Sequence, residues 1–259
     1  NIVFIFFYLF IKVIYIYVSM SVKNFIKSIT PKFLLEVYYD FKNRRKTYYG
    51  HHELDKKLKK YLNYKNGFFV ELGANDGVRQ SNTLYFEKNL DWNGVLVEPI
   101  KKKYLKCLKF RSNKNYFFNN ACVSFNYKDN KIKMIYSDLM SSISGKEIYN
   151  KVDAKKHAYD GKQYLNKNED IEEVWVDTKT LNNIFEEINA PKLMDFLSLD
   201  VEGSEIEVLN GINFLTYNFK FILIESRDDE EIKKYLINKK YNFLEKISKR
   251  DLLFKYKFF

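Results

Sequence analysis

The sequence is poor in the residues that build disulfide frameworks and metal centres. It has only 2 cysteines and 3 histidines in 259 residues. Cys107 and Cys122 form no CxxC motif and no metal-ligand spacing, so we expect reduced thiols in a cytoplasmic protein. His157 lies in a polar stretch, where it could act as a base, although a single loop histidine is more often merely solvated.

Acidic residues are also outnumbered, 33 against 44 Lys and Arg, which gives a formal charge of +11. Such a charge suits nucleic acid or an anionic membrane surface, and it suits a lysine-covered soluble protein equally well. The lysines are spread along the chain instead of forming one arginine-rich block, which favours the soluble protein. The hydrophobic content of 46% supports one sizeable α/β domain with a real core.

The first 50 residues differ from the rest. Residues 1–19 are almost wholly apolar and sit at the lower edge of the length that spans a bilayer. Because the first methionine is Met20, we favour translated upstream sequence or a dispensable leader, and a signal anchor remains the alternative. Residues 20–50 are predicted to form a basic amphipathic helical extension that lies on a membrane surface or packs on its own domain. Residues 51–259 form the main predicted domain.

One stretch organises the main domain, the run FFVELGANDG at Phe68–Gly77. Its apolar residues lead up to Glu71 and suit a strand that is covered on both faces. Gly73 and Gly77 permit the positive φ angles and the close ligand approach that a sharp strand-to-helix loop needs. The stretch therefore predicts a loop that binds a nucleotide-containing cofactor.

Buried strands and helices alternate after this loop. Further strands are predicted at Val95–Val97, at a segment ending near Asn120–Val123, at Phe196–Leu199 and at Phe221–Ile224. This order predicts a doubly wound parallel sheet of the α/β class with helices on both faces. Two short strands, Tyr241–Leu244 and Leu252–Tyr256, are expected to close the sheet as an antiparallel hairpin at its edge. The polar residues Ser137–Asp170 are expected to form a flexible lid or substrate loop.

Carboxylates gather at the sheet edge where ligands of such folds bind, beyond the carboxyl ends of the strands. They are Glu71, Asp76, Glu98, Asp200, Glu202 and Glu225. A dinucleotide would bring its pyrophosphate to this loop, where Glu71 and Asp76 would repel it, and the loop is GxxxG, not GxGxxG. S-adenosylmethionine instead carries an ammonium and a sulfonium, which an acidic loop attracts. Glu98 follows Gly77 by about 20 residues, the spacing of a ribose-binding acid.

Several motifs match one known family in the right order. They are VELGANDGVRQSNTLYFEKNLDWNGVLVEP, NACVS, TLNNIF, FLSLDVEGSEIEVLNGI and FILIESR, of which DVEGSE is the most specific. From about Lys57 to Phe254 the sequence resembles the FkbM-type methyltransferases, which use S-adenosylmethionine. The resemblance implies the class I methyltransferase Rossmann-like fold, with a seven-stranded, mostly parallel sheet and an antiparallel edge strand. It also implies O-methylation of a hydroxyl on a sugar, glycan or secondary metabolite.

The resemblance further implies roles for individual residues. The methionine part of the cofactor would be held by Glu71, Gly73, Asn75 and Gly77, the ribose by Glu98, and the adenine would be bordered by Ala121 and Cys122. Further cofactor contacts are predicted at Ala74, Asp76, Asn82, Thr83 and Pro99. Asp200 is the first candidate for the general base and Glu202 is the second. No third metal ligand with recognisable spacing accompanies these two acids, so no metal site is predicted.

Two other functions remain open. One is an RNA ribose 2′-O-methyltransferase, to which the basic charge points. The three prolines, at positions 31, 99 and 191, exclude the PP-aromatic motif of base amino-group methylation, and neither cysteine follows a proline as in enzymes that methylate cytosine carbon. The other is a non-catalytic, membrane-associated scaffold, against which the intact Glu71, Gly73, Glu98 and Asp200 argue. The expected partner is a small-molecule or glycan acceptor, with nucleic acid disfavoured and association with the cytoplasmic face of a membrane left open.

Overall fold

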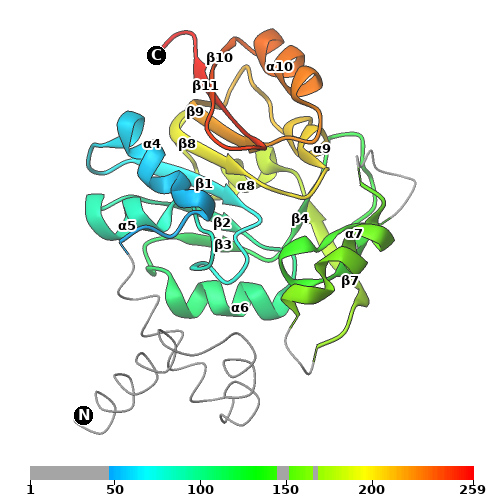
Figure 1. Ribbon diagram of the computed structural model, residues 1–259. Coiled ribbons are helices and arrows are strands. Elements are labelled where there is room, and N and C mark those ends of the chain that lie inside the picture. Colours follow the sequence, from blue (N-terminus) through cyan, green and yellow to red (C-terminus); the bar gives the residue numbers. More distant parts are fainter. Residues whose placement is uncertain (1–46, 145–151, 166–168) are drawn as a thin grey trace, which may run out of the picture. The chain divides into compact units, whose positions relative to one another are not determined.

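The computed structural model describes residues 47–144, 152–165 and 169–259 (Figure 1). The predicted leader and nearly all of the predicted helical extension, residues 1–46, lie outside this range, as do parts of the expected lid. Residues 48–259 form one unit by themselves. None of the helices in the described ranges is both long and apolar enough to cross a membrane.

The main sheet is arranged around β1 (Phe68–Leu72), the strand predicted from the central stretch of the sequence. Residues 69–72 of this strand are buried, as expected for a strand that is covered on both faces. The sheet has seven strands in the order β10-β11-β9-β8-β1-β2-β3. Their bounds are Asn93–Val97 for β2, Tyr116–Phe118 for β3, Leu193–Leu199 for β8, Asn218–Glu225 for β9, Tyr241–Lys246 for β10 and Asp251–Tyr256 for β11.

The sheet is mixed. β1 pairs in parallel with β2 and β8, and the parallel part extends to β3 and β9. β11 is antiparallel to both of its neighbours, β9 and β10. The α/β class and the antiparallel hairpin are thus confirmed, but the position of the antiparallel strand at the edge is wrong. Leu252, Leu253 and Phe254 are fully buried, so β11 needs a strand on each side, whereas the mostly exposed β10 tolerates the edge.

Helices cover both faces of the sheet (Figure 1). The side chains of successive β1 residues point to opposite faces, so that Phe69 and Val70 belong to two different apolar clusters. The Phe69 cluster includes side chains of α4 (Leu54–Leu62), α5 (Leu84–Leu90) and α6 (Lys101–Phe110). The Val70 cluster includes side chains of α8 (Leu181–Glu187), α9 (Glu205–Leu209) and α10 (Asp229–Asn238). A short 3-10 helix, His51–Glu53, precedes α4.

A second sheet stands beside the first. It has four strands in the order β4-β7-β5-β6, with bounds Ala121–Cys122 for β4, Lys131–Tyr136 for β5, Ser142–Ile143 for β6 and Glu172–Lys179 for β7. The expectation that the third strand ends near 120–123 is therefore wrong. β3 ends at Phe118, Asn119 turns back to donate to the carbonyl oxygens of Glu98 and Pro99, and β4 pairs with β7 instead.

The described part of the expected lid has regular structure. It contains the 3-10 helix η2 (Asp138–Met140), α7 (Ala154–Gly161) and the 3-10 helix η3 (Lys162–Tyr164). α7 contacts η2, β5 and β6, so that this segment packs against the second sheet. The Asp153 side chain accepts hydrogen bonds from the amides of Lys155 and Lys156 and caps α7, a local signal that its sequence provides.

Candidate functional site

A cavity of about 420 Å³ opens at the carboxyl ends of β1, β2, β8 and β9, the edge at which ligands of such sheets bind. It brings together most of the predicted site residues. They are Glu71, Gly73, Ala74, Asn75, Asn82, Glu98, Pro99, Ala121, Cys122, Asp200 and Glu202. Residues far apart in the sequence therefore meet in one place, as a shared site requires.

Three predicted cofactor contacts do not line this cavity: Asp76, Gly77 and Thr83. The Asp76 Oδ1 atom accepts hydrogen bonds from the amides of Val78 and Arg79, at 3.0 and 2.7 Å, and so closes the turn after the loop. Gly77 has a φ of +79°. The fully buried Thr83 donates to the Glu71 Oε2 atom at 2.6 Å. These residues therefore stabilise the conformation of the loop from outside the cavity lining.

The predicted cofactor loop, residues 73–77, comes very close to the end of β8. Gly73 has a φ of +72°, and a Cβ atom at this position would stand 2.0 Å from the carbonyl oxygen of Asp200. Asn75 also has a positive φ, 49°, and its backbone is held by two contacts. Its amide donates to the Glu98 Oε2 atom at 2.8 Å, and the Cys107 thiol donates to its carbonyl oxygen at 2.9 Å. The loop is therefore fixed between β1, β2 and β8.

Glu98 at the end of β2 is buried and accepts a second amide hydrogen bond, from Ile100 to its Oε1 atom at 2.8 Å. Burial away from water raises the pKa of Glu98 from 4.5 to about 7, against the lowering effect of the two amides and of Lys103. Burial likewise raises the pKa of Glu205, at the start of α9, to about 7. Both carboxyl groups thus change charge near neutral pH.

These two carboxyl groups predict how stability depends on pH. Between about pH 4.5 and about pH 7 the folded protein keeps protons that the unfolded chain has released. Stability should therefore fall as pH rises through this window. Thermal melting of the protein without cofactor, from about pH 5 to about pH 8 at constant ionic strength, measures this fall. The Glu205→Gln variant should show a shallower fall, and identical slopes for the two proteins would contradict the assignment to Glu205.

Three carboxylates meet at the ends of β8 and β9. One oxygen of each of Asp200, Glu202 and Glu225 lies within 4.8 Å of the others. The Asp200 side chain is exposed to solvent within the cavity, whose walls surround it with protein. The partial loss of hydration that these walls cause, and then the like charges of Glu225, Glu202 and Glu205, raise the pKa of Asp200 well above its ordinary value. Burial and Glu202 also raise the pKa of Glu225.

Basic side chains contact two of these carboxylates, Glu202 and Glu225. The Glu202 Oε2 atom contacts the His157 Nε2 atom at 2.9 Å and forms an ion pair with Arg227. Glu225 has Arg227 and Arg250 as weaker partners, at 3.8 and 3.4 Å. His157 comes from α7 and is buried, so the interpretation that it is merely solvated is wrong.

The comparison with protein families decides what kind of site this is. Residues 71–254 match the family model described as the methyltransferase FkbM domain. The chain belongs to the FkbM methyltransferase family. The match begins at Glu71, near the end of β1, and ends in β11, so it includes all of the predicted site residues. The resemblance inferred from the sequence motifs is confirmed.

Other comparisons add little to this assignment. No curated protein matches the chain. One similar crystal structure is that of a Staphylococcus aureus protein assigned provisionally as a caffeoyl-CoA O-methyltransferase. It is 11% identical, with a TM-score of 0.40, and the alignment covers 90% of this chain and 96% of that chain. A likeness at this level carries no argument about the reaction.

The carboxylate cluster of this FkbM methyltransferase allows more than one chemistry. Three carboxylate oxygens so close together could hold a divalent cation, attract a cationic ligand, or accept a proton from an acceptor. The third acid, Glu225, is predicted from the sequence only to follow a buried strand. No motif or spacing links it to Asp200. The pairing of β8 with β9 brings the two together. His157 and Arg227 likewise have no sequence signal that connects them to Glu202.

Proposed function

We propose that this chain is an S-adenosylmethionine-dependent O-methyltransferase whose acceptor is a hydroxyl of a sugar, a glycan or a secondary metabolite. The observation that carries the proposal is the shared cavity, which joins the loop at Gly73–Asn75 and the neighbouring Glu71 and Glu98 to the carboxylate cluster of Asp200, Glu202 and Glu225. A cation-binding loop and a proton acceptor are the two parts that transfer of a methyl group to an alcohol requires. The finer assignment to the class I methyltransferase fold is part of this proposal, supported by the strand order of the sheet.

The cavity fits S-adenosylmethionine in its unpaired acceptors. Asn75 and Asn82 line the cavity, and their buried Oδ1 atoms have no hydrogen-bond partner among the residues that the structure describes. Buried polar atoms are nearly always hydrogen-bonded, so these two oxygens call for a donor such as an ammonium group. Glu98 would accept from the ribose hydroxyls through its remaining lone pairs. When bound, S-adenosylmethionine would supply an electrophilic methyl group on a sulfonium.

The carboxylate cluster supports a base at Asp200. The raised pKa of Asp200 makes its carboxylate a stronger proton acceptor than an ordinary solvated aspartate. Glu202 is less available, because its Oε2 atom is already engaged by His157 and Arg227. Glu225 lies close to the positive charges of Arg227 and Arg250, which favour its ionised form and make it a weaker proton acceptor than Asp200. Asp200 is therefore the residue that we propose takes the hydroxyl proton.

The remaining wall of the cavity supports a hydroxylated acceptor. Polar side chains line it beyond the carboxylate cluster, namely His51, Arg79, Gln80, Gln163, Arg250 and Asp251. Fixed polar groups of this kind recognise hydroxyl groups by hydrogen bonds and discriminate against analogues that lack them. A sugar presents several such hydroxyls at once.

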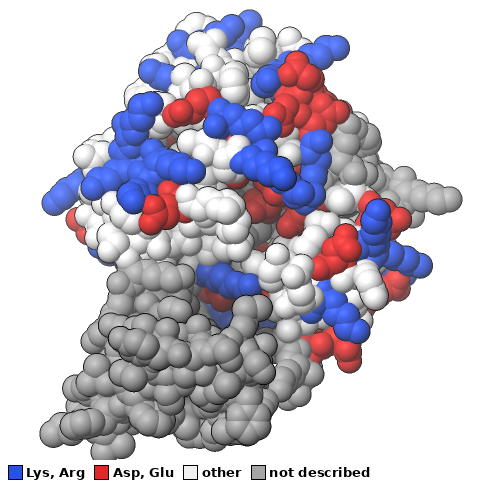
Figure 2. All heavy atoms as spheres, viewed as in Figure 1, with Lys and Arg blue, Asp and Glu red and all other residues white. Residues whose placement is uncertain are grey.

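The charges around the cavity give no support to an RNA acceptor. Acidic side chains outnumber basic ones among the described lining residues, of which only Arg79, Arg227 and Arg250 carry a fixed positive charge. Lys and Arg are interspersed with Asp and Glu over the described surface seen in Figure 2. A phosphate chain would meet repulsion at the cavity. That nucleic acid is not the partner stays a prediction, and steeply salt-dependent RNA binding would speak against it.

Calorimetry with S-adenosylmethionine tests the proposal directly. We expect saturable one-site binding to the wild type, and a roughly tenfold or greater loss of affinity in Glu98→Gln, because a buried acceptor of the ribose hydroxyls is weakened. A matched control is Glu53→Gln, since the Glu53 side chain is largely exposed and lies outside the cavity lining. A folded protein with no measurable affinity would end the enzyme proposal and leave the non-catalytic scaffold.

The acceptor class needs a second measurement. Wild-type protein and methyl-labelled S-adenosylmethionine would be incubated in three separate reactions, with a pool of glycosides, a pool of phenolic metabolites or a pool of RNA. We expect label in an alkali-stable methyl ether of a hydroxylated acceptor. Label in RNA alone, or in a methylamine, would overturn the proposed acceptor class while leaving the methyltransferase assignment in place.

A further inference from the structure

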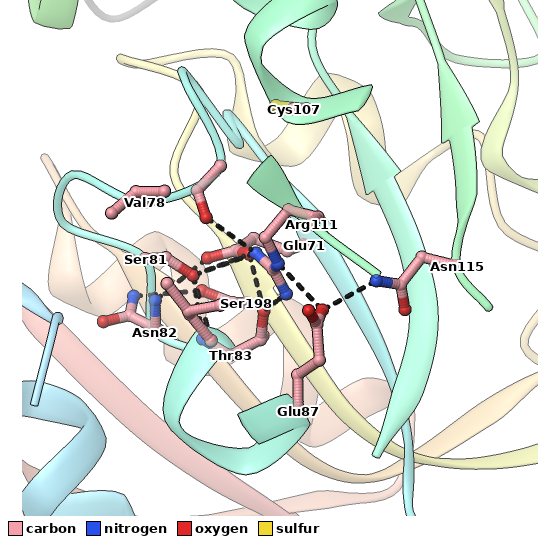
Figure 3. Close-up of polar contacts among 12 residues, drawn as sticks. Glu71, Val78, Ser81, Asn82, Thr83, Glu87, Cys107, Arg111, Asn115 and Ser198 are labelled. Atoms are coloured by element: carbon pink, nitrogen blue, oxygen red, sulfur yellow. Dashed lines mark hydrogen bonds and ion pairs between the residues drawn. The ribbon is translucent and has the colours of Figure 1, made fainter. Parts of the chain in front are cut away.

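A buried polar cluster lies behind the cofactor loop (Figure 3), and the proposed reaction does not use it directly. Its centre is Arg111, the residue that follows α6, whose side chain has no exposure to solvent. We call it the Arg111 cluster and define it as Arg111, Glu71, Ser81, Thr83 and Glu87. Nothing in the sequence marks Arg111, because its partners lie 24 to 40 residues away.

One guanidinium group joins four parts of the fold. The Arg111 Nε atom donates to the Glu87 Oε2 atom on α5 at 2.8 Å, and Nη1 donates to the Glu71 Oε2 atom on β1 at 3.0 Å. Nη2 donates to the Thr83 Oγ1 atom at 2.8 Å, just before α5 begins. Nη1 also reaches the carbonyl oxygen of Gly77 in the loop, at 3.1 Å. The planar fork of arginine makes these contacts at once, which a lysine ammonium on its flexible stem does not reproduce.

Glu71 connects Arg111 to residues of the cavity wall. Its Oε1 atom accepts the amide of Asn82 at 2.9 Å, and its Oε2 atom accepts the hydroxyls of Ser81 at 3.0 Å and Thr83 at 2.6 Å. The Asn82 side chain donates to the Ser198 hydroxyl on β8 at 3.1 Å, and its buried Oδ1 atom has no hydrogen-bond partner within the described parts of the chain. Asn82 lines the cavity, whereas Arg111 and Thr83 do not.

The charges of the cluster do not cancel. Two carboxylates, the buried Glu71 and the partly buried Glu87, face the single guanidinium of Arg111. Removal of the guanidinium would leave the buried Glu71 and its neighbour Glu87 without this cation, and proteins tolerate an unpaired buried charge poorly. The excess negative charge lies directly behind the loop, where a cationic ligand gains from it.

We propose that Arg111 is a positioning residue for the cofactor, which acts through Glu71 and Thr83 and touches neither cofactor nor acceptor. It holds residues 73–82 in the shape that binds S-adenosylmethionine, and it holds the Asn82 side chain at the cavity wall. The inference rests on the proposed function, because it assumes that S-adenosylmethionine is the ligand of this cavity.

The decisive variant is Thr83→Val, which keeps the shape of the side chain and removes the hydroxyl that accepts from Arg111 and donates to Glu71. Since Thr83 does not line the cavity, a change in affinity must be transmitted through the cluster. Calorimetry well below the melting temperature should give a Kd for S-adenosylmethionine that is raised roughly five- to tenfold. Thr83→Ser restores the hydroxyl and should restore the wild-type Kd. Arg111→Lys should raise the Kd more than tenfold, because the fork of donors is lost.

A matched control separates positioning from general stability. Leu236→Ala removes a fully buried side chain of α10 on the other face of the sheet and should lower the melting temperature without changing the Kd. An unchanged Kd in Thr83→Val, or an equal rise in Leu236→Ala, would overturn the inference. If Arg111→Lys does not fold, the comparison of Thr83→Val with Thr83→Ser still tests the inference. Wild type that fails to bind S-adenosylmethionine is a different result, which overturns the proposed function itself.

Discussion

Replacement of Asp200 by asparagine is expected to lower methyl transfer by roughly 10²-fold or more, with the affinity for S-adenosylmethionine nearly unchanged. Asparagine keeps the size of the side chain, and the backbone carbonyl that faces Gly73 is unaffected. The amide group of asparagine, however, cannot take the proton of an acceptor hydroxyl. Transfer of the label from S-adenosylmethionine to a hydroxylated acceptor measures turnover. Calorimetric Kd values measure the cofactor affinity separately.

The pH dependence of the same reaction gives a second readout. Burial and the neighbouring carboxylates raise the pKa of Asp200, so part of the enzyme holds a protonated, inactive Asp200 at low pH. The wild-type rate should therefore rise with pH until Asp200 is ionised, and this limb should be absent from the residual activity of Asp200→Asn. Unchanged turnover in Asp200→Asn would remove this residue as the base.

Glu202→Gln is the matched comparison for the catalytic prediction. A glutamine oxygen can still accept from Arg227, and the variant removes one negative charge from the cluster of three acids. We expect a smaller loss of turnover than in Asp200→Asn, together with a lower pKa for the rising limb, because one of the like charges that raise the pKa of Asp200 is gone. The reverse order of the two losses would exchange the roles of the two acids.

The sequence predicts those parts of the site that local pattern encodes. The apolar run of β1, the carboxylate at its end and the glycine that follows are adjacent in the chain, so their chemistry can be read together. Glu98 and Asp200 each follow a buried strand, and parallel strands end at one edge of a sheet. The structure confirms that these residues border one cavity.

The remainder depends on partners that are distant in the sequence. Arg111 and Glu71 have no common motif, and neither do His157 and Glu202, because tertiary packing alone brings each pair together. The position of β11 within the sheet follows from burial on both of its faces, which a short apolar strand does not disclose by itself. Three of the predicted cofactor contacts also lie outside the cavity lining, for a physical reason. In a tight loop some side chains face the cavity, whereas others, such as Asp76, close the turn behind it.

The second large effect is expected at Gly73, where alanine should abolish measurable binding of S-adenosylmethionine. An alanine there would hold a positive φ of about the observed +72°, and its Cβ atom would stand 2.0 Å from the Asp200 carbonyl oxygen. Backbone cannot give way as a flexible side chain can, so the loop or the end of β8 must move. The strain and the overlap together should cost about 2 to 5 kcal/mol of folding stability.

Gly77→Ala is the matched control for that prediction. Gly77 also has a positive φ, +79°, but its added Cβ atom would meet the Arg111 side chain at 2.8 Å and no backbone atom closer than 3.2 Å. Gly77 lies outside the cavity lining as well. Gly77→Ala should therefore lose stability but retain weakened binding, whereas Gly73→Ala loses binding even at temperatures where it remains folded. Melting curves and calorimetry on both variants test this order. Equal Kd values for the two would show that close contact between the loop and β8 is not what shapes the cofactor site.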